Sequence, residues 1–241
     1  MTQHIAVMGV GAIGGIIGGY LTRAGRDVTL IDAWPANIEQ IKSHGLTITA
    51  QQEKFVTQPT ALHIGEVSAI ESQFDLVFLC VKSYDTQWTT KFIQPYLAPN
   101  GFIISAQNSI NEDSIASMVG WPRVMGLVIT LGAAMYEPGH AERTSSVTRL
   151  AFKPGEPSGI ITDRAMNLSK ILEDVGRSQP TTNLWGERWA KLATNSMSNA
   201  LAAITGLKSA ELRQEPSVRS VQIRIAGELV KVATTLGIVV E

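Results

Sequence analysis

The sequence predicts an α/β protein: a doubly wound, mostly parallel sheet followed by an all-α second domain. Three observations lead to this fold class. Short apolar segments alternate with helical patterns through the first half of the chain, and a glycine-rich turn joins the first strand to the first helix. From residue 181 onward the patterns are helical only. We therefore assign residues 1–180 to the α/β domain and residues 181–241 to the helical domain.

The strands of the predicted sheet are continuous apolar runs, as expected of parallel strands buried on both faces. They cover residues 5–8, 27–32, 76–81, 102–105 and 124–130. The helices of this domain mostly end at a glycine, and they cover residues 12–24, 36–44, 84–96 and 161–175. We expect a hairpin over 46–57, and we expect the alternating segments at 141–143 and 148–152 to extend the sheet. Helices at 185–201 and 218–235 are expected in the helical domain.

The charge balance gives no electrostatic footprint for nucleic acid or anionic lipid. Lysine and arginine total 20 against 21 acids, a net charge of −1, and the chain has no basic run. The single cysteine, Cys80, lies in an apolar run and cannot form an internal disulfide, so we expect a small buried hydrophobe rather than a nucleophile. These features fit a reducing, cytoplasmic setting, and we expect no metal site.

Residues 5–21 carry no charge, but the stretch is too short for a membrane anchor. A spanning helix needs about 20 apolar residues, whereas this run stops at Thr22 and Arg23. The chain starts with Met-Thr-Gln-His and so lacks the positive charge of a signal peptide. We therefore expect no membrane segment.

The same stretch contains a G-x-G-x-x-G motif that follows a strand, opens a helix and precedes an acid at the end of the next strand. Gly9 permits a tight turn, Gly11 lets the backbone approach a pyrophosphate, and Gly14 lets helix and strand pack closely. Phosphate oxygens are expected at the helix N-terminus. This context predicts a Rossmann-type dinucleotide site whose contacts are Gly9, Gly11, Ala12, Ile13 and Gly14. The alternative is a glycine-rich helix packed in a core.

Asp32, at the end of the second strand, predicts which dinucleotide binds. A carboxylate there accepts hydrogen bonds from both ribose hydroxyls and repels a 2′-phosphate, whose recognition needs a cation. Ala33, Trp34 and Pro35 supply no cation. The sequence therefore favours NAD over NADP. The alternative is that Asp32 only caps the helix that begins near Pro35.

Polar side chains follow two later strands at their carboxyl ends. Lys82 follows one strand, and Gln107 and Asn108 follow the next. Ligands of doubly wound sheets bind outside the carboxyl ends of the strands, so we expect these three residues to face the cofactor cleft. The alternatives are a solvated loop lysine and a turn-forming asparagine.

The helix at 185–201 carries a polar stripe on an otherwise apolar surface. Lys191, Asn195 and Asn199 are spaced i, i+4 and i+8, so they share one face. An ammonium and two carboxamides suit a small, oxygen-rich anion such as a 2-oxo acid. The alternative is a stripe that caps neighbouring loops or faces water.

These motifs together resemble the ketopantoate reductase (2-dehydropantoate 2-reductase) family: the glycine motif at Gly9, then Cys80-Val81-Lys82-Ser83, Gln107-Asn108, and Trp189-Ala190-Lys191-Leu192 with Asn195 and Asn199. The resemblance implies a Rossmann domain that binds the nicotinamide cofactor and a helical domain that closes the cleft. It implies that Lys191 is the general acid, that Asn195 and Asn199 hold substrate oxygens, and that Lys82 and Asn108 lie at the nicotinamide and substrate. It also suggests a homodimer.

The sequence departs from the family pattern at three places. Most members prefer NADPH and place a basic residue where this chain has Asp32, which resembles instead the NAD-dependent D-2-hydroxyacid dehydrogenases of the D-mandelate type. Ser109 stands where a glycine is common. The chain stops at Glu241 within a helical pattern, whereas members continue through more helices, so we expect a C-terminal part of the helical domain to be missing.

The function predicted from these residues is hydride transfer from a nicotinamide cofactor to a 2-oxo acid, with Lys191 donating the proton to the carbonyl oxygen. Asn108, Asn195 and Asn199 are the predicted substrate contacts. Two alternatives remain open: an NAD-dependent D-2-hydroxyacid dehydrogenase, and a dinucleotide-binding regulatory protein without catalysis.

Overall fold

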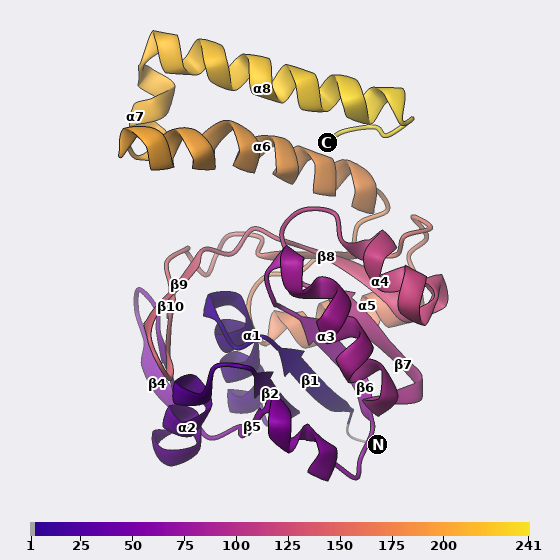
Figure 1. Ribbon diagram of the computed structural model, residues 1–241. Coiled ribbons are helices and arrows are strands. Elements are labelled where there is room, and N and C mark those ends of the chain that lie inside the picture. The colour runs from indigo at the N-terminus through magenta and orange to yellow at the C-terminus, as the bar shows by residue number, and fades with distance from the viewer. Residues whose placement is uncertain (1–2) are drawn as a thin grey trace. The chain divides into compact units, whose positions relative to one another are not determined.

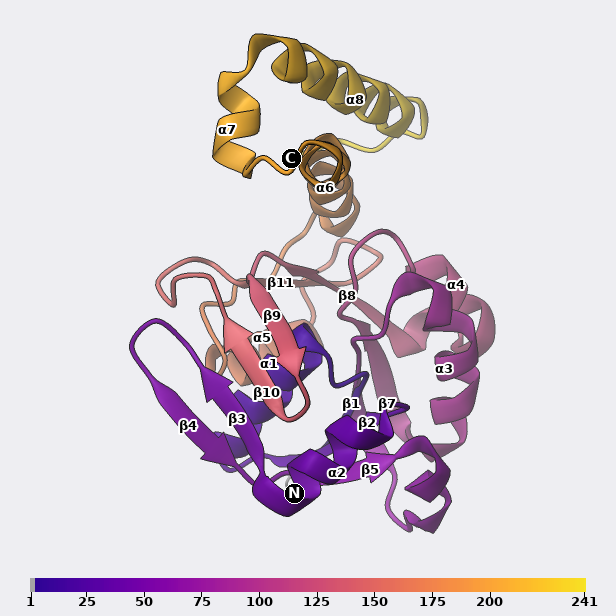
Figure 2. The ribbon, with the colours of Figure 1, turned by 60° about the vertical axis from the view of Figure 1, so that its left-hand side comes forward.

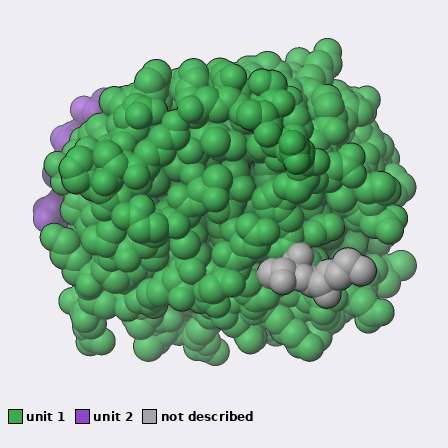
Figure 3. All heavy atoms as spheres, turned by 90° about the horizontal axis from the view of Figure 1, so that it is seen from below, with its two compact units in different colours: residues 1–107, 111–182 green, residues 108–110, 183–241 purple. Residues whose placement is uncertain are grey.

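The computed structural model describes residues 3–241, which fold into two compact units. The first unit contains the chain up to residue 107 and residues 111–182, and the second contains residues 108–110 and 183–241. Figure 3 colours the first unit green and the second purple. Each unit is described by itself below.

The first unit is built on a seven-stranded sheet with the order β11-β8-β7-β6-β1-β2-β5. Its strands are β1 (His4–Met8), β2 (Asp27–Asp32), β5 (Thr60–His63), β6 (Phe74–Leu79), β7 (Leu97–Ser105), β8 (Val124–Ile129) and β11 (Phe152–Gly155). All neighbours pair in parallel except β8 and β11, which are antiparallel. The predicted doubly wound, mostly parallel sheet is confirmed. The strand order reverses between β1 and β6, where such sheets bind their ligands.

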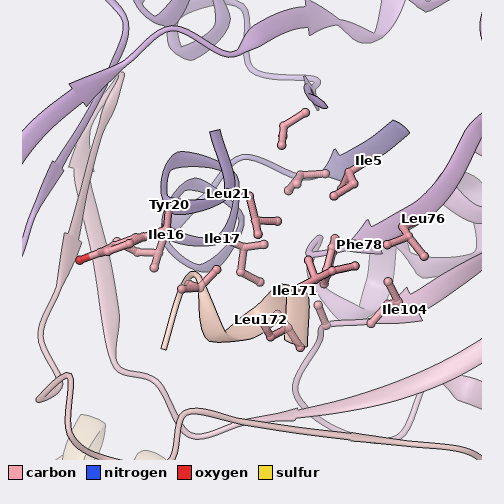
Figure 4. Packing of buried hydrophobic residues seen from close by; sticks show 14 of the residues in the cluster. Ile5, Ile16, Ile17, Tyr20, Leu21, Leu76, Phe78, Ile104, Ile171 and Leu172 are labelled. Atoms are coloured by element: carbon pink, nitrogen blue, oxygen red, sulfur yellow. The ribbon is translucent and has the colours of Figure 1, made fainter. Parts of the chain in front are cut away.

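Helices cover both faces of this sheet (Figure 1). They are α1 (Ala12–Arg23), α2 (Pro35–His44), α3 (Thr86–Ile93), α4 (Glu112–Val119) and α5 (Asp163–Glu173), with short 3₁₀ turns η1 (Ile64–Ala69), η2 (Ser83–Asp85), η3 (Gln94–Tyr96) and η4 (Trp121–Arg123). Alternate residues of β1 enter two different cores: Ile5 belongs to a cluster that includes residues of α1 and α5, and Ala6 to one that includes residues of α4. Figure 4 shows the first of these cores closing around Phe78. Burial on both faces explains why the strands are continuous apolar runs.

A second sheet, with the order β4-β3-β10-β9, packs on α1 (Figure 2). Its strands are β3 (Leu46–Thr49), β4 (Lys54–Thr57), β9 (Ala133–Glu137) and β10 (His140–Arg143). The expected hairpin is therefore present as β3 and β4. The close approach uses small residues of α1, because a Cβ on Gly19 would lie 2.7 Å from a side-chain carbon of Ile48.

The expectation that residues 141–143 extend the main sheet is wrong. β10 pairs in parallel with β3 and antiparallel with β9 in the second sheet. The turn at Gly139 fixes this position, because its carbonyl accepts from the Thr47 N–H at 2.8 Å and its own N–H donates to Asn37 Oδ1 at 2.7 Å. The segment that does extend the main sheet is β11, along the edge of β8.

The second unit is helical in its described residues. It contains α6 (Leu184–Thr205), α7 (Ser209–Gln214) and α8 (Pro216–Thr235). Asn183 caps α6 by accepting the Gly186 N–H at 3.0 Å, and its Nδ2 donates to the Val239 carbonyl at 2.9 Å. The C-terminal segment therefore packs on the start of α6. None of the helices in residues 3–241 is both long and apolar enough to cross a membrane.

Candidate cofactor and substrate site

The turn after β1 requires glycine at two of its positions. Gly9 has a φ of +91°, and a Cβ there would lie 2.8 Å from the Val81 backbone nitrogen. Its N–H donates to the Ile31 carbonyl at 2.9 Å, which ties the turn to β2. A Cβ on Gly14 would lie 2.0 Å from the Gly9 carbonyl oxygen. The first turn of α1 therefore packs directly on the glycine turn, and no larger residue fits at either position.

Gly11 differs, because none of the described residues, 3–241, lies where its side chain would be. A Cβ on Gly11 would meet no atom within 4 Å, and its φ of −80° is accessible to any residue. Gly11 is the N-cap of α1, and its helix end has no side-chain cap, so the backbone N–H groups around Ala12 and Ile13 open into this space. An open backbone surface at a helix N-terminus fits a phosphate group.

Asp32 lies beside this turn and bonds to it. One carboxylate oxygen accepts the Val10 N–H, and the other accepts the Trp34 N–H at 2.8 Å. Trp34, rather than Asp32, is the N-cap of α2. The carboxylate therefore joins the glycine turn to the segment before α2, and it also lines the adjacent pocket.

A pocket of about 200 Å³ opens at the carboxyl ends of β1, β2 and β6. It lies where the strand order reverses, as expected for a dinucleotide site. Its lining includes Gly9, Gly11, Asp32, Ala33, Ile64, Cys80, Lys82, Asp85 and Trp88. Burial raises the pKa of the Cys80 thiol, which keeps it neutral and argues against a nucleophile. Four of the predicted cofactor contacts are thus brought together around one pocket.

Gln107 takes a different position from the one expected. It is buried after β7, and its Nε2 donates to the Val81 carbonyl at 3.0 Å and to Thr86 Oγ1 at 2.9 Å. Gln107 is not one of the described residues that line the pocket. Its carboxamide joins the end of β7 to the segment between β6 and α3, which contains Lys82.

Asn108 is exposed and groups with the second unit. The next residue, Ser109, has a φ of +72°. This left-handed conformation favours glycine, which explains in backbone terms why a glycine is common at this position in proteins with the same motif. The loop keeps the conformation that a glycine would adopt, at a cost in strain.

The polar stripe lies on one face of α6. The helix runs without interruption from Leu184 to Thr205, so Lys191, Asn195 and Asn199 follow one another at successive turns. Lys191 and Asn195 are half-buried, and Asn199 is exposed. These three residues belong to the second unit, and the pocket residues belong to the first.

One residue of the site was not predicted from the sequence. Asn37, in the first turn of α2, is fully buried, and its Nδ2 donates to the Val10 carbonyl at 2.9 Å. Its Oδ1 accepts the Gly139 N–H, so one side chain holds both the glycine turn and the turn of the second sheet. The sequence shows only an asparagine near the start of a predicted helix, and the partners of its side chain are distant in the chain.

Two family models match the chain. Residues 5–156 match the model described as ketopantoate reductase PanE/ApbA, and residues 183–241 match the model of its C-terminal part.

Curated relatives extend over most of the chain. The 2-dehydropantoate 2-reductase of Pyrococcus horikoshii is 30% identical over 240 residues, which cover 98% of this chain and 75% of that protein. The enzyme of the same name from Aquifex aeolicus is 29% identical over 236 residues, with 96% and 73% covered.

Solved structures share the fold. A PanE/ApbA family ketopantoate reductase from Ralstonia eutropha has a TM-score of 0.86 and 31% identity, with 99% of this chain and 76% of that chain covered. D-mandelate dehydrogenase, solved with NADH and anilino(oxo)acetate, has a TM-score of 0.88 at 24% identity, with 99% and 76% covered. The second likeness concerns the fold alone.

Proposed function

The chain belongs to the ketopantoate reductase family, and we propose that it reduces a 2-oxo acid to the 2-hydroxy acid, as a 2-dehydropantoate 2-reductase does. It is an oxidoreductase of a family that acts in the pantothenate pathway, and its cofactor is a nicotinamide dinucleotide. The observation that carries the proposal is the open space above Gly11 beside a pocket that Asp32 lines.

The cofactor fits the residues of the glycine turn. We assign the pyrophosphate to the turn of Gly9, Gly11, Ala12, Ile13 and Gly14. Gly11 leaves the backbone at the start of α1 open to a phosphate, and the close packing of Gly9 and Gly14 keeps the turn in shape. Asp32 holds the ribose hydroxyls, since a carboxylate oxygen has lone pairs beyond those that accept Val10 and Trp34. This assignment favours NAD, because a 2′-phosphate would meet a carboxylate. Lys82 and Asn108 are assigned to the nicotinamide end, and Gln107 positions the segment that carries Lys82.

The substrate is assigned to the polar stripe of α6. When bound, the reduced nicotinamide supplies the hydride to the 2-carbon. Lys191 donates a proton to the carbonyl oxygen as negative charge develops there, so the carbonyl becomes a hydroxyl. Asn195 and Asn199, one and two turns further along the helix, donate hydrogen bonds from their carboxamides to the carboxylate or a hydroxyl of the substrate, and Asn108 adds a third such contact.

A second candidate activity is that of an NAD-dependent D-2-hydroxyacid dehydrogenase of the D-mandelate type. Asp32 favours it, because it places an acid where a cofactor with a 2′-phosphate needs a cation. Both activities use the same residues and differ in the substrate side chain. We also propose a cytoplasmic setting, consistent with the single cysteine, and a homodimer, as the family resemblance implies.

The test is oxidation of NADH and of NADPH against a panel of 2-oxo acids, followed by absorbance of the reduced nicotinamide. The proposal expects turnover with NADH, with ketopantoate and phenylglyoxylate separating the two activities. Lys191→Ala should lower turnover about 10²- to 10⁴-fold and leave cofactor binding intact. Lys231→Ala, which removes an exposed lysine of α8, is the matched control and should turn over normally. Cofactor binding without turnover on every oxo acid would support a regulatory protein instead.

A further inference from the structure

Two side chains of the segment after β6 line the cofactor pocket and have no part in the glycine turn. Asp85 ends η2 and is the N-cap of α3, and Trp88 follows one turn later. Trp88 is 41% exposed, and its Nε1 donates to Asp85 Oδ1 at 2.6 Å. Both residues line the same pocket as Asp32.

We propose that Asp85, held in place by Trp88, is a second determinant of cofactor choice. Its side chain adds a second carboxylate to the adenosine pocket and so excludes a cofactor with a 2′-phosphate. This inference rests on the proposed function, because it concerns the cofactor assigned there. It goes beyond Asp32 by naming a second carboxylate that lines the pocket and the side chain that orients it.

The backbone around Asp85 is fixed before any ligand binds. The Asp85 N–H donates to the Lys82 carbonyl at 2.9 Å, and the Asp85 carbonyl accepts from Thr89 Oγ1 at 2.7 Å. Thr86 Oγ1 donates to the Ser83 carbonyl at 2.8 Å and accepts from Gln107. The carboxylate therefore has a defined position, and it would lose little entropy on binding a ligand.

The charges of the pocket oppose a phosphate. Among its described lining residues the carboxylates are Asp32 and Asp85, and the single cation is Lys82, whose ammonium is assigned to the nicotinamide end; the three charges sum to −1. A phosphate monoester adds about −1.5 to −2 charges at neutral pH. Because like charges repel, a phosphate in this pocket should bind more weakly than a ribose hydroxyl. Ribose hydroxyls, in contrast, can donate hydrogen bonds to both carboxylates.

The remaining wall suits an adenine ring. Ala33, Ile64 and the indole of Trp88 are apolar lining residues, and a planar indole offers a stacking surface. Trp88 thus has two effects: its ring faces the pocket, and its N–H orients the Asp85 carboxylate.

The experiment measures dissociation constants of NADH and NADPH by isothermal titration calorimetry, so it does not depend on turnover. Asp85→Asn keeps an acceptor for the indole N–H and removes the charge. It should tighten NADPH binding about tenfold while NADH binding changes less than about threefold. Asp113→Asn is the matched control, because Asp113 is an exposed acid in the first turn of α4. It should leave both constants unchanged.

Trp88→Phe keeps an aromatic ring and removes the donor to Asp85. The ratio of the NADPH dissociation constant to the NADH dissociation constant should fall, as in Asp85→Asn, but by less. A third readout uses the unaltered protein: raising the salt concentration from about 0.01 to 0.15 M shortens the Debye length from about 30 Å to 8 Å. The dissociation constants of NADH and NADPH should then become more similar.

The outcomes separate the inference from its premise. If NADH binds but Asp85→Asn leaves the ratio unchanged or raises the preference for NADH, the role of Asp85 is overturned and the proposed function stands. If neither dinucleotide binds the unaltered protein, the proposed function itself fails.

Discussion

Replacement by alanine should affect different properties of the protein at two glycines of the same motif. At Gly14 an added Cβ would lie 2.0 Å from the Gly9 carbonyl oxygen, so the backbone must move. At Gly11 the added Cβ would meet no protein atom within 4 Å. We therefore predict that Gly14→Ala reduces stability, and that Gly11→Ala reduces cofactor binding without a large loss of stability.

The magnitudes follow from the two environments. Overpacking typically costs about 1–3 kcal/mol and sometimes more. Because the clashing atom at Gly14 is a backbone oxygen, we take the upper end of this range, about 3 kcal/mol. Alanine regains up to about 1 kcal/mol through its better helix propensity, so a net loss of about 2 kcal/mol is expected. At Gly11 alanine loses about 1 kcal/mol as an N-cap and regains about 0.4–1 kcal/mol from a more restricted unfolded chain. The free energy of unfolding should therefore change by less than about 1 kcal/mol.

The assay combines urea unfolding, followed by circular dichroism, with calorimetric titration of NADH. Gly11→Ala should weaken NADH binding at least about tenfold, because a methyl group occupies the space assigned to the pyrophosphate. Unchanged NADH binding in Gly11→Ala would refute the assignment of that space. Equal stability losses in both variants would refute the distinction between a packing glycine and a binding glycine.

Three further predictions address the chemistry, the backbone and the pH dependence. Lys191→Ala should lower kcat about 10²- to 10⁴-fold, the usual range for a general acid, with the NADH dissociation constant within about twofold; survival of turnover would remove Lys191 from its role. Ser109→Gly should raise the free energy of unfolding by about 0.5–1 kcal/mol, because its φ of +72° is strained for serine; a lower urea midpoint would contradict this. Burial alone would raise the pKa of Glu156, but hydrogen bonds from the side chains of Arg164 and Thr162 hold that pKa below its ordinary value. The stability from Glu156 is therefore present above its unfolded pKa of about 4.3 and is lost as pH falls through the lower folded pKa. Because the Arg164 side chain is partly exposed, Glu156→Gln should cost about 1.5–3 kcal/mol at pH 7, the usual contribution of hydrogen bonds to a charged group. The loss of stability at acid pH should also become smaller in this variant, and an unchanged loss would show that another group causes it.

Local sequence patterns predicted the elements whose causes are local. The strand at 76–81 and the helix at 36–44 were expected from apolar runs and a terminal glycine, and the structure has them as β6 and α2, within two residues. The edge strand β5 was not expected, because Thr60–His63 is short and half polar. An edge strand is buried less than a central one, so its sequence carries a weaker signal.

Long-range pairings account for most of what the sequence did not show. The position of β10 depends on β3, which lies about 90 residues earlier in the chain. Asn37 acquires its role from Val10 and Gly139, neither of which is close in sequence. Gln107 follows a strand as predicted, but its carboxamide is turned toward Val81 and Thr86. Motif spacing places a residue near a site, and packing then determines where its side chain points.

The measurement that tests the central claim most directly is a crystal structure of the protein with NADH and an unreactive 2-oxo acid analogue. The account predicts the pyrophosphate over Gly11, the adenosine ribose at Asp32, and the Lys191 nitrogen about 3 Å from the analogue's carbonyl oxygen. A dinucleotide bound elsewhere, or a Lys191 nitrogen out of hydrogen-bond reach of that oxygen, would contradict it.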